Sequence, residues 1–237
     1  METKISVILP TYNEKETVRT VIGETAKNVS LLKEIIVVDD NSPDGTGDIV
    51  KEISTKDKRV KLIQRFNEKG LTSAIWTGIS NAKGEYIAWM DCDMGMPPEV
   101  INKLVDELSG CDIAVGSRYA AGGKDTRGFF RRSVSYCLNF FARMMLKVKT
   151  KDLTSGFLTV KRDVFSKLKL SGDYGEYCIR FLCEAEKLGY KIKEVPYVFK
   201  DRTAGESKSE AGFFRFGWGY YKMIMRLRAE GGKKMEE

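Results

Sequence analysis

The sequence predicts an α/β protein in which helices flank a mostly parallel sheet. Short apolar runs rich in β-branched residues alternate along the chain with amphipathic segments of about ten to fifteen residues, the pattern of successive βαβ units. The runs are apolar at nearly every position, as expected for strands buried on both faces. At 237 residues, the chain is long enough to bury one large core of this kind.

The first half of the chain shows the clearest alternation. Strands are expected at 4–9, 35–38, 60–63, 86–90 and 112–116. Pro10 is expected to end the first of them. Helices are expected between the strands, at about 11–26, 46–53, 71–82 and 97–108. Because crossovers in such units are right-handed, the strands should run in parallel with their carboxyl ends at one edge of the sheet.

Beyond residue 117 the alternation weakens. The expected elements are a long helix at 129–148, a short strand after 152–157, a helix at 176–188, a strand at 192–199, a polar loop at 201–208 and an aromatic, basic helix at 213–228. The long helix has a polar row at a spacing of four, formed by Arg131, Ser135, Asn139, Arg143 and Lys147. Because no linker, low-complexity tract or internal repeat is present, residues 1–237 are expected to form one domain.

The composition excludes several kinds of chemistry. The chain has no histidine, which removes imidazole bases, His-containing triads and His-ligated zinc. The formal net charge of +7 suits an anionic partner. Residues 1–4 lead directly into a strand, and no long uncharged apolar run occurs, so a cytosolic chain is expected. Its five cysteines are odd in number and form no C-x-x-C pair, so we expect reduced thiols at Cys92, Cys111, Cys137, Cys178 and Cys183.

The stretch from Tyr86 to Asp93 contains the most informative chemistry. Its strand ends in Asp91 and Asp93, and residues two apart on an extended backbone point the same way, so the two carboxylates can converge. A divalent cation that bridges them to a phosphate ester would relieve their repulsion, and hard oxygen ligands suit Mg²⁺ or Mn²⁺. Taken alone, an Asp-x-Asp pair more often marks a strand that ends in a solvated acidic turn. Only the rest of the chain favours the metal site.

Polar motifs gather at the carboxyl ends of the expected strands, where open parallel sheets bind their ligands. They are 10–14 (PTYNE), 38–46 (VDDNSPDGT), 91–93 (DCD) with 97–99 (PPE), 116–119 (GSRY) and R-x-x-G-x-S-K at 202–208. In this order, and over nearly the whole chain, they resemble the nucleotide-sugar glycosyltransferases with a GT-A fold (family 2). Within that family they resemble the dolichol-phosphate or polyprenyl-phosphate mannosyltransferases. No G-x-G-x-x-G fingerprint follows the first expected strand, and no P-loop sequence occurs in the chain.

The resemblance implies where a nucleotide-sugar donor binds. The implied donor-binding residues are Pro10, Tyr12, Glu14, Asp40, Asp91, Arg202 and Lys208. Tyr12, Glu14 and Asp40 would hold the base and ribose, and the Asp91–Asp93 pair would place Mg²⁺ or Mn²⁺ on the diphosphate. Two simpler readings remain open: Asp40 and its neighbour Asp39 could cap the next helix, and Arg202 could be a solvated surface charge.

The reaction implied by the resemblance is transfer of a hexosyl group, with mannose from GDP-mannose as the first choice, to polyprenyl phosphate with inversion. An ionised phosphate acceptor needs no protein base, and Arg118, Arg131 and Ser135 are expected to hold it. The alternatives are another nucleotide sugar, such as UDP-glucose, or a hydroxyl acceptor. Nucleic acid is not expected as a partner, because acidic residues crowd the strand ends.

This chain departs from the pattern of the mannosyltransferase branch at two places. Gly95 stands where the mannosyltransferase branch often has a glutamine near the metal, and residues 177–179 replace a usual acidic position, with Glu176 left without a role.

Residues 1–117 are expected to form the nucleotide-sugar half, and residues 118–228 the acceptor-binding half. The aromatic, basic C-terminal helix suits either a membrane interface or packing on the sheet. Peripheral association with the cytoplasmic face of a membrane is expected, with room for a separate membrane-anchoring subunit.

Overall fold

The computed structural model describes residues 4–172, 175–200 and 213–233, with side chains omitted at 213–216 and 231–233. Its main sheet contains β1 (Ile5–Thr11), β2 (Leu32–Asp39), β3 (Val60–Gln64), β4 (Tyr86–Trp89), β5 (Ile113–Ser117), β7 (Leu158–Lys161) and β8 (Ile192–Pro196). A second, small sheet pairs β6 (Lys124–Asp125) with β9 (Val198–Phe199). The helices are α1 (Val18–Asn28), α2 (Thr46–Lys56), α3 (Leu71–Asn81), α4 (Val100–Glu107), α5 (Phe129–Leu146), α6 (Tyr177–Lys187) and α7 (Phe213–Lys233), with a 3₁₀ turn η1 (Arg162–Ser166).

The main sheet is mostly parallel, as the sequence predicts. Its strand order is β3-β2-β1-β4-β7-β5-β8, and every neighbouring pair is parallel except those that involve β7. Strand β7 runs antiparallel to both β4 and β5. The residues that precede β7 therefore lie at the same edge as the carboxyl ends of the parallel strands.

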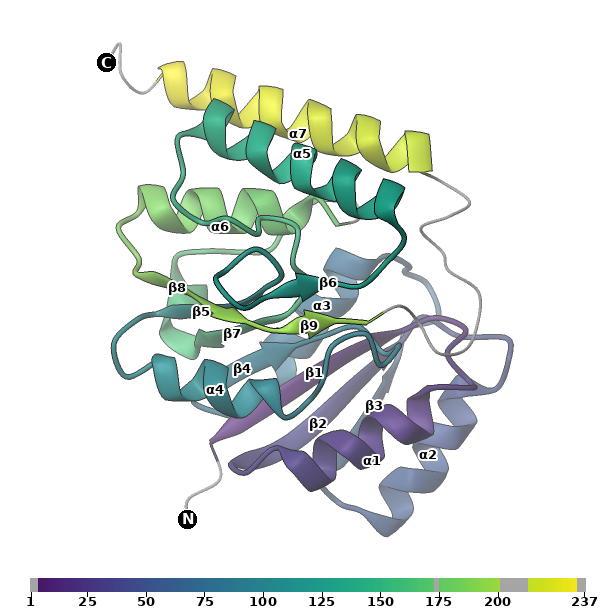
Figure 1. Cartoon of the computed structure of the whole chain (residues 1–237). Coiled ribbons are helices and arrows are strands. Elements are labelled where there is room, and N and C mark those ends of the chain that lie inside the picture. The colour runs from purple at the N-terminus through teal and green to yellow at the C-terminus, as the bar shows by residue number, and fades with distance from the viewer. Residues whose placement is uncertain (1–3, 173–174, 201–212, 234–237) are drawn as a thin grey trace.

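Alternating side chains along the strands divide the core into two layers. Ile8, Ile36 and Trp89 pack with α3 and α6 on one face of the sheet. Val7, Ile35 and their equivalents pack with α1, α2 and α4 on the other. Figure 1 shows these two groups of helices on opposite sides of the sheet.

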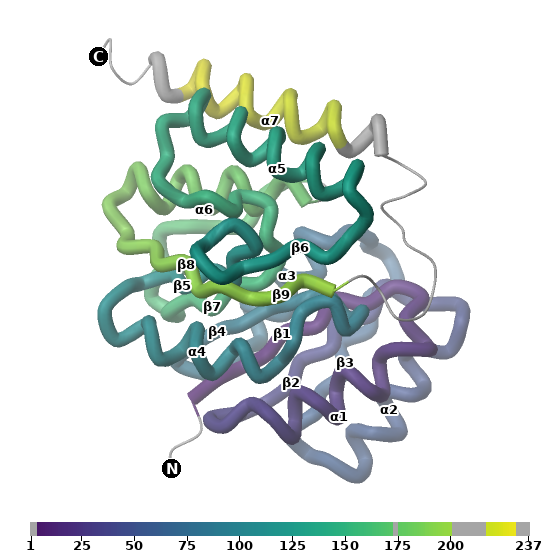
Figure 2. The backbone as a smooth tube through the Cα atoms, in the orientation of Figure 1, coloured from purple at the N-terminus to yellow at the C-terminus, as the bar shows by residue number. Residues whose placement is uncertain are grey.

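The helices α5 and α7 lie side by side at the outside of the molecule (Figures 1 and 2). Helix α7 also contacts α6, so it is linked to the core through Ile224 and Leu227, which are buried there. Within the described part of the chain, none of the helices has the length and apolar character needed to cross a membrane.

The end of β1 and the strand expected at 192–199 differ from the prediction, and both differences have a physical cause. Strand β1 continues through Pro10 to Thr11, because β4 pairs with β1 only as far as Ile8. The missing N–H of Pro10 therefore falls on the side where the ladder has already ended. The single strand expected at 192–199 is divided: it leaves β5 after Pro196, and residues 198–199 pair with β6 instead.

Candidate active site

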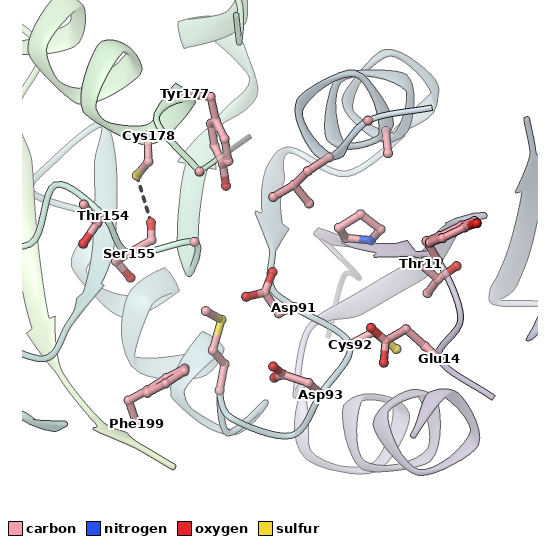
Figure 3. A pocket seen from close by; sticks show the side chains of 18 of the residues that line it. Thr11, Glu14, Asp91, Cys92, Asp93, Thr154, Ser155, Tyr177, Cys178 and Phe199 are labelled. Carbon is pink, nitrogen blue, oxygen red and sulfur yellow. Dashed lines mark hydrogen bonds between the residues drawn. The ribbon is translucent and has the colours of Figure 1, made fainter. Parts of the chain in front are cut away.

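A cavity of about 540 Å³ opens at the carboxyl edge of the parallel strands. It is lined by residues that follow β1, β2, β4 and β5, by the segment that precedes β7, and by the ends of α6 and β9. Figure 3 shows Thr11 and Glu14 on one side of it, Tyr177 and Ser155 on the other, and the acidic pair between them. The topology thus brings residues from distant parts of the sequence to one place.

Asp91 and Asp93 both line this cavity directly after β4. The Gly95 N–H donates to Asp93 Oδ1 at 3.0 Å and fixes the turn between them. A Cβ on Gly95 would lie 2.9 Å from the Phe199 ring and 3.0 Å from the Lys200 carbonyl oxygen, closer than ordinary contact. The packing of β9 against this turn therefore leaves little room for a side chain at Gly95.

The acidic pair fits a cation that is shared with a bound diphosphate. Among the described residues, no group of three or more His, Cys, Asp or Glu side chains is arranged to hold a metal ion. Mg²⁺ characteristically binds proteins through one or two carboxylates, and completes its octahedral shell with substrate phosphates and water. Two carboxylates at a cavity wall match that donor set.

The side of the cavity formed by β1 and β2 contains the predicted nucleotide residues Pro10, Tyr12, Glu14 and Asp40, all of which line it. Tyr12 is 36% exposed, and the Lys69 ammonium lies over its ring, 4.8 Å from the centroid. An accessible aromatic face beside a cation is suited to stacking on a base.

Asp40 is held by Arg65, a residue that the sequence interpretation missed. Arg65 Nε donates to Asp40 Oδ1 at 2.6 Å, and the Gly70 N–H donates to Oδ2 at 2.8 Å. The Arg65 guanidinium also donates to Ser73 Oγ and to the Gly70 carbonyl. Its place directly after β3, at the ligand-binding edge, was the signal that would have identified it.

The structure also assigns the capping of α2. The N-cap of α2 is Gly45, and Asp44, the residue before it, accepts the backbone N–H of Thr46 at 2.9 Å and its hydroxyl at 2.6 Å, so it satisfies one free N–H of the first turn. Asp39 accepts hydrogen bonds from the Thr11 hydroxyl and from the Ser42 N–H and hydroxyl, which stabilise the preceding turn. Asp40 takes part in neither arrangement and faces the cavity.

Arginines gather on the opposite side of the cavity, where Arg118, Arg127 and Arg131 are lining residues. Arg118 is buried, and its Nε and Nη2 donate to the two carboxylate oxygens of Asp152 at 2.9 and 2.7 Å. Burial opposes its charge, but attraction to Asp152 raises the pKa of Arg118 well above its ordinary value. Arg127 forms a similar fork on Asp125, at 2.9 and 2.6 Å.

The other predicted acceptor residues are placed differently from one another. Arg131, in the first turn of α5, is partly buried and lines the cavity. Ser135 lies one turn further on but is not a lining residue; its hydroxyl accepts a hydrogen bond of 2.8 Å from the Tyr119 phenol. Arg202 and Lys208 lie outside the described residues, so their placement stays a prediction.

Tyr177 is a lining residue for which the sequence predicted no role. It begins α6 and is 2% exposed, and its phenol oxygen accepts a hydrogen bond of 2.9 Å from the Trp89 indole N–H. Burial raises the pKa of Tyr177 well above its ordinary value, so the phenol keeps its proton. The sequence gives no sign of this contact, because Trp89 ends β4 and Tyr177 begins α6, 88 positions further along the chain.

A mostly parallel sheet with an acidic pair directly after β4, at the carboxyl edge of the strands, is the architecture of the GT-A class of glycosyltransferases. The chain belongs to glycosyl transferase family 2, whose family model matches residues 6–169. It is similar in structure to glucosyl-3-phosphoglycerate synthase from Mycobacterium tuberculosis in complex with Mn²⁺, UDP and glucosyl-3-phosphoglycerate. That similarity has a TM-score of 0.72 at 19% identity and covers 96% of this chain and 80% of the other.

Three relatives show greater sequence similarity. The chain is 39% identical to a dolichol-phosphate mannosyltransferase from Pyrococcus furiosus, over 86% of this chain; it spans only 59% of that protein's length. It is 35% identical to polyprenol monophosphomannose synthase from Mycolicibacterium smegmatis, over 94% of this chain and 89% of that protein. It is 31% identical to undecaprenyl-phosphate mannosyltransferase from Micrococcus luteus, with 88% of each chain covered.

Proposed function

We propose that this family 2 enzyme transfers mannose from GDP-mannose to a polyprenyl phosphate and inverts the anomeric centre. The observation that supports it most directly is the arrangement of one cavity with three parts. Tyr12 and Asp40 form a nucleotide side, Asp91 and Asp93 lie in the middle, and the arginines form an anionic-acceptor side. The names of the three relatives agree on a polyprenyl or dolichol phosphate acceptor and on mannose.

The donor would be held by residues 1–117. Stacking on Tyr12 positions the base, and Asp40, itself fixed by Arg65, accepts hydrogen bonds from the nucleoside. Asp91 and Asp93 would hold Mg²⁺ or Mn²⁺, and the cation would neutralise the negative charge on the departing nucleoside diphosphate. Arg202 and Lys208 belong to the same proposal as further diphosphate ligands.

The acceptor phosphate would be held by residues 118–228. Arg118, Arg127 and Arg131 line the cavity on this side, and Ser135 supports it from behind by accepting the hydrogen bond of the Tyr119 phenol. A phosphomonoester has a second pKa of about 6 and is already ionised at neutral pH, so it needs to be aimed rather than deprotonated. A chain that contains no histidine is suited to this kind of acceptor.

The outer helices would lie on the cytoplasmic face of a membrane. The α5 residues Phe129, Phe130 and Phe140 are 77%, 68% and 57% exposed, and Trp218 of α7 is 58% exposed. Cations accompany these rings: Arg132 lies 5.7 Å from the Phe129 centroid, and Lys222 lies 5.4 Å from that of Trp218. Exposed aromatic rings beside basic residues are typical of helices at a membrane interface.

The donor assignment is tested by thermal unfolding with GDP, UDP, ADP or CDP, each with and without Mn²⁺. A ligand that binds only the folded state raises the unfolding temperature, and GDP with Mn²⁺ should give the largest rise. Tyr12→Ala and Asp40→Asn should reduce that rise. A larger rise with UDP would overturn the choice of GDP-mannose and favour a UDP-sugar donor.

A further inference from the structure

Gly156 occupies the point at which the acidic pair and the Tyr177 phenol face each other. A Cβ built on Gly156 would lie 3.8 Å from Asp91 Oδ1, 3.8 Å from the Tyr177 phenol oxygen and 3.6 Å from Met96 Cε. Figure 3 shows Tyr177 and Asp91 reaching into the cavity from different elements. An atom placed beside the Gly156 Cα therefore contacts both oxygens at ordinary van der Waals distance.

The phenol of Tyr177 is fixed in position and direction. Its oxygen accepts the indole N–H of Trp89 at 2.9 Å, and both residues are almost fully buried, at 2% and 1% exposed. An indole N–H can only donate, so the phenol is the acceptor in this bond, and its own proton is available for an acceptor in the cavity. Trp89 is the last residue of β4 and lies two residues before Asp91. The end of one strand therefore positions both the phenol and the acidic pair.

A hexosyl group attached to a diphosphate held at Asp91 would occupy this space. We propose that Tyr177 donates a hydrogen bond to a hydroxyl of the transferred hexosyl group, and that Gly156 leaves room for the sugar ring. This inference rests on the proposed function and assigns two residues that select the sugar. Tyr177 contributes the polar contact, whereas the missing side chain of Gly156 provides the space beside Asp91 that the sugar ring needs.

The test compares the binding of GDP-mannose and of GDP by calorimetry in the presence of Mg²⁺. Tyr177→Phe should weaken GDP-mannose binding about 3- to 10-fold, the usual effect of losing one hydrogen bond, and leave GDP binding unchanged. Gly156→Ala should have the same selective effect, since its methyl group fits the protein but occupies sugar space. Tyr190→Phe is the matched control, because Tyr190 packs at the edge of the core and does not line the cavity.

GDP-mannose analogues that each lack one sugar hydroxyl identify the group that Tyr177 contacts. One analogue should bind the wild type more weakly than GDP-mannose does, and bind the wild type and Tyr177→Phe equally. Equal weakening of GDP and GDP-mannose in Tyr177→Phe, or unchanged binding of both, would overturn the inference. If the wild type prefers another nucleotide sugar, the proposed donor is wrong, and the same comparison with that sugar and its diphosphate still tests Tyr177.

Discussion

Arg118 offers a quantitative test of how the acceptor side of the cavity is built. Its guanidinium donates to both oxygens of Asp152, and the two side chains are only 6% and 0% exposed. Nη2 also donates to Thr154 Oγ1 at 2.8 Å. Arg118→Ala removes these bonds and leaves a buried carboxylate without its counter-charge, which should lower the free energy of unfolding by about 3–5 kcal/mol.

The assay is urea unfolding followed by circular dichroism. Arg131→Ala is the control and should lose less than about 1 kcal/mol, because Arg131 is only partly buried. Combining Arg118→Leu with Asp152→Asn removes both buried charges and should recover most of the lost stability. A loss below about 1 kcal/mol in Arg118→Ala would refute this reasoning and make Arg118 a ligand without a structural role.

Three further predictions follow from the same structure. Asp93→Asn should lower turnover about 100-fold with the fold intact, and full wild-type activity in excess chelator would contradict the metal role. Arg131→Ala should raise the KM for polyprenyl phosphate about 10-fold, and Ser135→Ala about 3-fold, with GDP affinity unchanged; unaltered acceptor kinetics would argue against both. Burial alone would raise the pKa of Glu34, but the hydrogen bonds from Lys61, Ser6 and the Lys83 N–H lower it from its ordinary value. The ionised Glu34 therefore stabilises the fold above its pKa in the unfolded chain, and this contribution is lost as the pH falls through its lower pKa in the folded protein. Glu34→Gln should consequently flatten the acid limb of a curve of unfolding free energy against pH.

The parallel part of the sheet was predictable because its signals are local. Buried strands need continuous apolar runs, and helices need apolar residues at their own period, so both leave a record in neighbouring positions. The antiparallel insertion of β7 between β4 and β5 was not predictable, since it depends on pairing between strands distant in sequence. The same is true of residues 198–199, whose partner is β6.

The candidate site shows the same division. Asp91 and Asp93 were predicted from their spacing at a strand end together with the other motifs of the chain, and both line the cavity. Asn139 was read as part of a polar row, yet it is buried: it accepts the Leu153 N–H at 2.7 Å and donates to Thr154. Contacts of this kind, like those of Arg65 and Asp40, arise only when distant segments meet.

Transfer of labelled sugar tests the central claim most directly. Purified protein is incubated with Mg²⁺ and GDP-mannose labelled in the sugar, together with either polyprenyl phosphate or the matching polyprenol. Label should pass into the organic phase with the phosphate acceptor as polyprenyl mannosyl phosphate, with release of GDP, and Asp93→Asn should slow this transfer about 100-fold. Equal or greater transfer to the polyprenol, or transfer to neither acceptor, would contradict the account.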